Sequence, residues 1–135
     1  MFSFCRSAMA ISLVLGVMLP IQARAIDLNG AWATDPALCA LVYTKKQGHV
    51  NFSELSDIYG SGFIIDGNKI RGKAAKCTIT SRKEDSDAVL LSAACASAIM
   101  KLNVQFSLKV IDDNSITRLF PEMQQMKLNY YRCTL

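Results

Sequence analysis

Histidine is almost absent from this chain of 135 residues, which contains only His49. Hydrolases of the Ser-His-Asp or Cys-His kind need a histidine beside the nucleophile. His49 follows Gln47-Gly48, and no nucleophile motif surrounds it. We therefore expect an exposed loop histidine and a protein that is not an enzyme.

Carboxylates give no alternative catalytic centre. They cluster in two short polar segments, residues 84–87 and 112–113. Glycosidase chemistry needs two carboxylates that flank a cleft, one of them with a raised pKa. Carboxylates in hairpin turns stay ionised because water solvates them, and neither cluster has the spacing of an EF-hand loop. No catalytic residue, bound metal or cofactor is expected.

Long apolar runs are missing after residue 21. The run over residues 7–21 follows a short basic segment, contains Pro20, and precedes Ala23-Arg24-Ala25, which fits the small-x-small rule for signal peptidase. The run is too short to span a bilayer comfortably, so a cleaved signal peptide is favoured over an anchor helix. The sequence predicts a signal peptide over 1–25 and one periplasmic or secreted domain over 26–135, with no integral membrane segment after processing.

The mature domain has little net charge. Removing Arg6 and Arg24 from the 15 basic residues leaves 13 against 11 acidic ones, a formal charge of +2. This balance gives no nucleic-acid footprint. A chain of this length forms one domain with a modest core, which gains stability from covalent cross-links.

Four cysteines remain in the mature domain: Cys39, Cys77, Cys95 and Cys133. An even number in a short exported chain indicates two disulfides, and a metal site is disfavoured because no Cys-x-x-Cys pair is present. Four cysteines allow three pairings. A hairpin centred near Ser86 would place Cys77 opposite Cys95, at a separation that a disulfide can bridge. Cys39 would then pair with Cys133.

Alternating apolar and polar residues predict β-strands, most clearly over residues 102–111. The polar cluster 112–115 is typical of a turn, after which residues 116–120 can return as a hairpin partner. Asp66-Gly67-Asn68 predicts another hairpin turn. About eight short strands joined mostly by tight turns indicate a mainly β fold, a small antiparallel barrel or sandwich.

One short helix is expected after the first strand. Thr34-Asp35-Pro36 is typical of a helix start, with an oxygen-bearing cap residue followed by proline. Residues 37–43 would form about two turns, and Lys45-Lys46 would lie at the negative end of the helix dipole. A short strand over residues 50–52 would follow.

The most suggestive candidate binding patch is Lys69, Arg71 and Lys73, with Lys76 near them. Alternate residues of a strand face the same side, so three cations would line one face. These cations would form either the solvated outer face of an edge strand, where lysine deters unwanted pairing, or a patch for an anionic envelope component or an acidic protein partner.

Gly30-Ala31-Trp32 on the first strand and Arg132 on the last resemble the Gly-x-Trp motif and late arginine of calycin-type barrels, the lipocalin-like superfamily. The resemblance implies barrel closure, with Trp32 at the barrel floor and Arg132 across its face. Periplasmic protease inhibitors of the Inh type share a similar small barrel and an early Gly-x-Trp.

The whole mature chain also resembles uncharacterised small exported proteins of Gram-negative bacteria. The shared segments are Trp-Ala-Thr-Asp-Pro with Leu38-Cys39, Gly60-Ser61-Gly62-Phe63, and Tyr131-Arg132-Cys133. Together these features predict a non-enzymatic binding or inhibitor module that acts by surface or barrel-mouth contact. The alternative is a structural or stress-related envelope protein without a small ligand. An apolar cavity reaching solvent would favour the first, and an interior filled by side chains the second.

Overall fold

The computed structural model describes residues 16–20, 24–123 and 126–135. Most of the expected signal peptide over 1–25, including its apolar run up to residue 15 and Ala23 of the cleavage site, lies outside the described residues. Within the described part of the chain, no helix is long and apolar enough to cross a membrane.

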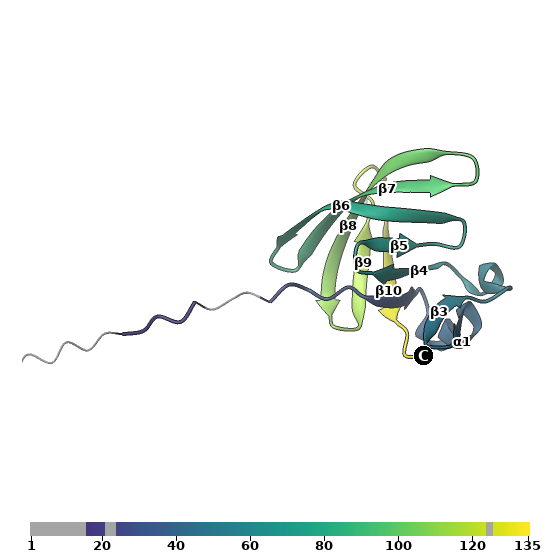
Figure 1. Cartoon of the computed structure of the whole chain (residues 1–135), viewed down its shortest axis with the longest axis horizontal. Coiled ribbons are helices and arrows are strands. Elements are labelled where there is room, and N and C mark those ends of the chain that lie inside the picture. The colour runs from purple at the N-terminus through teal and green to yellow at the C-terminus, as the bar shows by residue number, and fades with distance from the viewer. Residues whose placement is uncertain (1–15, 21–23, 124–125) are drawn as a thin grey trace, which may run out of the picture.

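Eight antiparallel strands close into a barrel in the order β1-β10-β9-β8-β7-β6-β5-β4 (Figure 1). Their bounds are β1 (Gly30–Ala33), β4 (Gly62–Asp66), β5 (Lys69–Arg71), β6 (Ala75–Asp85), β7 (Ala88–Ser97), β8 (Lys101–Asp112), β9 (Ser115–Leu119) and β10 (Lys127–Arg132). β1 pairs with both β4 and β10, which closes the barrel. The predicted mainly β fold is confirmed, as a barrel with one short helix after the first strand.

Strand alternation places the apolar side chains inside the barrel. In β7, Val89, Leu91, Ala93 and Cys95 are buried, whereas the residues between them are exposed or half-buried. The predicted strand over 102–111 is β8, and its hairpin partner is β9. The inward side chains of all eight strands form one core.

The β6–β7 hairpin contains the Cys77–Cys95 disulfide, with the two Cα atoms 4.0 Å apart. The predicted pairing is confirmed. The turn is tighter than the polar segment suggested, because β6 continues to Asp85 and only two residues connect the strands. A bulge between Ile79 and Ser81 then shifts the register by one residue. Without this bulge, Cys77 would face Ala96 instead of Cys95.

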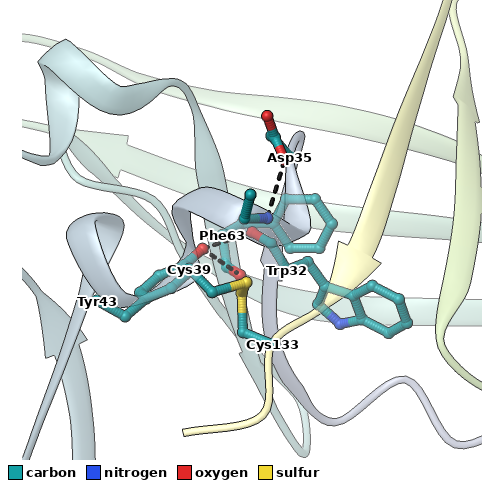
Figure 2. The surroundings of a disulfide bond; sticks show 7 residues. Trp32, Asp35, Cys39, Tyr43, Phe63 and Cys133 are labelled. Carbon is teal, nitrogen blue, oxygen red and sulfur yellow. Dashed lines mark hydrogen bonds between the residues drawn. A yellow bond between two sulfur atoms is a disulfide. The ribbon is translucent and has the colours of Figure 1, made fainter.

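Residues 34–61 form an insertion between β1 and β4. It contains the 3-10 turn η1 (Pro36–Leu38), the helix α1 (Cys39–Val42), the two-stranded sheet of β2 (Tyr43–Lys46) and β3 (His49–Phe52), and the turn η2 (Ser56–Tyr59). Asp35 caps η1 by accepting a hydrogen bond of 2.9 Å from the Ala37 N–H (Figure 2). The predicted Cys39–Cys133 disulfide is confirmed and ties this insertion to the end of β10.

The prediction for Lys45 and Lys46 was wrong. Both residues belong to β2 and do not lie at a helix end. The helix ends at Val42 because Tyr43 adopts an extended backbone and pairs with Phe52 across the small sheet. The two rings lie 5.2 Å apart, so the hairpin buries aromatic surface that a longer helix would not.

Antiparallel pairing gives the barrel two different ends. The open end is defined here by the connections at residues 72–74 and 98–100, by residues 120–123 and 126, and by Ser61 with Gly62 at the start of β4. The closed end is defined by the turns at residues 67–68, 86–87 and 113–114 and by the segment before β1. Residues 124–125 of the open-end connection lie outside the described residues.

Candidate binding cavity in the barrel

Trp32 and Arg132, the two residues expected at barrel closure, lie together at the closed end. The Trp32 side chain is fully buried, and its indole N–H donates to the Leu28 carbonyl at 2.9 Å. The guanidinium of Arg132 lies 4.4 Å from the centre of the indole ring. Arg132 also donates to the carbonyls of Asp27 and Asp113, each at 2.9 Å, and to that of Asn29. These contacts tie the end of β10 to the segment before β1 and to the 113–114 turn.

The interior of the barrel is hollow toward the open end. A cavity of about 380 Å³ lies there and is partly open to solvent. Most of its wall is apolar, and the residues that line it are Ser61, Gly62, Phe63, Ile65, Ile70, Gly72, Ala75, Cys77, Leu91, Phe106, Leu108, Arg118, Leu128 and Tyr130. Phe63 and Tyr130 pack edge to face, with ring centres 4.8 Å apart, and hold one side of the wall.

Arg118 is the one charged residue among the described residues that line the cavity. Its guanidinium lies over two aromatic rings, 4.6 Å from the centre of Phe106 and 4.5 Å from that of Phe120. The cavity therefore combines an apolar body with a single fixed cation.

A second hollow, of about 600 Å³, lies at the closed end beside Trp32 and Arg132. Its wall includes Arg24 and Ala25, which the expected cleavage after residue 25 would remove. The mature protein would therefore lack part of this wall, so the cavity at the open end is the better candidate site.

The candidate basic patch lies on the outer face of the barrel, since Lys69 and Arg71 flank the buried Ile70 and Arg71 is the Cα partner of Lys76. β5 is not an edge strand, because it pairs with both β4 and β6. The expectation of an edge-strand face was therefore wrong: closure of the barrel gives β5 a neighbour on each side.

Most cations of this patch contact the protein itself. Lys69 donates to the Thr78 hydroxyl at 2.9 Å, and Arg71 donates to the Val50 carbonyl at 2.9 Å. Lys73 donates to the Glu54 carbonyl at 2.8 Å and forms an ion pair of 2.9 Å with Asp57. Arg71 and Lys73 thus hold the insertion against the barrel.

His49 is exposed at the start of β3, next to the β2–β3 turn. The carboxylates of residues 84–87 and 112–113 are exposed at the closed end, away from the cavity. A backbone N–H bond from Asn114, helped by the Ser115 hydroxyl, lowers the pKa of Asp112. Within the described ranges, no group of three or more His, Cys, Asp or Glu residues is placed to hold a metal ion.

Arg118 was not among the residues predicted from the sequence, although a signal was present. Ile116, Arg118 and Phe120 alternate along β9 and its end, and Ile116 is a buried core residue. A strand with period two therefore directs Arg118 inward. A charge at an inward-facing position is the feature that marks it.

No family model matches the chain, and no curated protein or solved structure matches it. The function of the cavity must therefore be inferred from the side chains that line it.

Proposed function

We propose that this protein is an exported, non-enzymatic binding protein that takes up a small apolar molecule through the open end of its barrel. The observation that carries the proposal is the apolar cavity of about 380 Å³. Ligand pockets usually measure about 300–1,000 Å³ and are lined by apolar side chains with a few placed polar groups. An eight-stranded barrel is either filled by side chains or wide enough for one small ligand.

The cavity favours this function over a purely structural role in the envelope. A structural barrel gains stability by filling its interior, because an unfilled apolar space loses contacts on every wall. The contacts of Arg71 and Lys73 with the insertion favour the barrel mouth over the basic outer face as the binding surface.

The two disulfides support export. Disulfides persist in oxidising compartments such as the periplasm or the exterior of the cell, and each adds about 2–5 kcal/mol to a small domain. The arrangement of Trp32 and Arg132 supports the proposed likeness to calycin-type barrels.

Binding of the neutral apolar dye N-phenyl-1-naphthylamine tests the proposal on protein purified after export of the full chain. We expect saturable binding of one dye per chain, with increased dye fluorescence. Ala75→Phe should weaken binding at least tenfold, because Ala75 lines the cavity. Ala94→Phe is the matched control, since Ala94 is exposed on the adjacent strand. Absence of saturable binding, or equal loss in both variants, would contradict the proposal.

A further inference from the structure

We infer that the ligand is an amphiphile with one carboxylate head group, which Arg118 binds at the open end while the apolar tail fills the cavity. This inference rests on the proposed function of the cavity and adds the chemical class of its ligand.

Arg118 points into the barrel. Its Cα partners are Leu108 on β8 and Leu128 on β10, and both of these residues line the cavity. Apolar side chains therefore flank the guanidinium on both neighbouring strands. A cation in this place costs stability unless an acceptor satisfies it.

Among the described residues, the surroundings of Arg118 leave the hydrogen-bonding edge of its guanidinium free for a ligand. The guanidinium lies against the rings of Phe106 and Phe120, but aromatic faces do not accept its in-plane N–H groups as a carboxylate would. Within the described part of the chain, the Arg118 side chain makes no hydrogen bond and no ion pair. Contact with the two rings restricts the motion of the guanidinium, which lowers the entropic cost of binding an anion.

Arg132 provides an internal comparison. It also stacks on an aromatic ring, but its guanidinium donates to three backbone carbonyls, those of Asp27, Asn29 and Asp113. Arg132 is a structural arginine whose donors are occupied. Arg118 has the same stacking without these acceptors, which is the arrangement expected of a binding group.

Charge is also segregated between the two ends of the barrel. The closed-end turns and the strand residues beside them carry the carboxylates of Asp66, Asp85, Asp87, Asp112 and Asp113, against two cations, Lys69 and Arg132. The corresponding positions at the open end carry Lys73, Lys76, Lys101 and Lys127, with Glu122 as the acid. An anion is therefore attracted to the end where the cavity opens.

One cation in an otherwise apolar wall fits a ligand with one charge. The guanidinium fork matches the geometry of a carboxylate, which can accept two parallel N–H bonds. A second charged group on the ligand would be buried against apolar side chains without a partner, at a high cost. The tail must therefore be apolar.

Competition between decanoate and 1-decanol for the bound dye tests the inference, because the two molecules share one tail and differ in the head group. We expect decanoate to displace the dye at a concentration about ten to a hundred times lower than 1-decanol. Arg118→Gln should abolish this preference and leave displacement by 1-decanol unchanged. Arg118→Lys should keep part of the preference, because the charge remains but the fork is lost.

Lys127→Gln is the matched control, since it removes one positive charge from the open end outside the cavity wall. It should leave the preference for decanoate nearly intact. Equal displacement by both molecules, an unchanged preference in Arg118→Gln, or an equal loss in Lys127→Gln would overturn the inference while leaving the proposed function in place. Failure of the dye and both competitors to bind would overturn both.

Discussion

The guanidinium of Arg132 covers the indole ring of Trp32 at 4.4 Å, and the two residues are Cα partners where the last strand of the barrel meets the first. Closure therefore brings together residues that are far apart in the sequence. Gly30 makes this possible: its φ is +129°, and a Cβ atom there would lie 3.1 Å from the Arg132 Nη1 atom. The contact joins the first and last strands near one end of the barrel, and the apolar cavity opens at the other.

Replacing Arg132 with methionine should destabilise the fold by about 1–3 kcal/mol, because three backbone carbonyls lose a charged donor and the indole loses its cation. Urea denaturation followed by tryptophan fluorescence measures this change. Arg118→Met is the comparison, and we expect it to unfold at the same or a higher urea concentration. If the two variants lose equal stability, the two arginines do not have the different roles assigned to them.

Gly62→Ala should cost about 1–3 kcal/mol of stability, because the added Cβ atom would collide with the Tyr43 hydroxyl and the Trp32 carbonyl. These two groups are hydrogen-bonded to each other, as Figure 2 shows, so neither can move freely. Gly72→Ala provides the control: its Cβ atom would lie 3.6 Å from the Ala75 carbonyl, an ordinary contact. Thermal unfolding of both variants measures the difference, and equal melting temperatures would contradict the assigned packing.

The two disulfides should contribute unequally to stability. Cys39–Cys133 closes a loop with a sequence separation of 94, whereas Cys77–Cys95 has a separation of 18. In the chain-entropy account, replacing both cysteines of the long loop with alanine costs about 4.5 kcal/mol, against about 3 kcal/mol for the short loop. Guanidinium denaturation of the two double variants tests this order. A larger loss for the Cys77→Ala, Cys95→Ala protein would mean that contacts of the buried Cys77–Cys95 pair outweigh loop entropy.

Stability should fall in strongly alkaline solution, in part because of Tyr43. Burial is the main cause that raises the pKa of this phenol above its ordinary value of 10. Because folding raises this pKa, the folded state favours the neutral phenol. The stability that Tyr43 contributes is therefore fully present below pH 10 and is lost as the pH rises above that value. Urea midpoints measured from pH 8 to 11 should therefore decline less steeply in Tyr43→Phe than in the unchanged protein. Parallel declines would exclude Tyr43 as a source of the alkaline loss.

Features set by local alternation were predictable from the sequence, and features set by distant contacts were not. The β8–β9 hairpin follows from residues 102–120 alone, because period two and a polar turn define both strands. The small sheet of β2 and β3 was only half predicted. Tyr43 is held in β2 by Phe52 and by the carbonyls of Trp32 and Phe63, which come from three other segments.

The cavity could not be predicted for the same reason. Its volume depends on how side chains from β4, β5, β6, β7, β8, β9 and β10 fill a shared space, and no single segment contains that information. Arg118 was the one local sign of the cavity, because it places a charge at an inward-facing strand position. The Cys77–Cys95 pairing was predictable only because the bulge in β6 compensates for the two-residue turn.

A crystal structure of the protein with 10-bromodecanoate tests the central claim most directly, because anomalous scattering locates the bromine at the end of the tail. The account predicts bromine inside the barrel, among Ile65, Ile70 and Leu91, with the carboxylate against the Arg118 guanidinium. Bromine bound only on the outer surface, with no ligand in the cavity at saturating concentration, would contradict it.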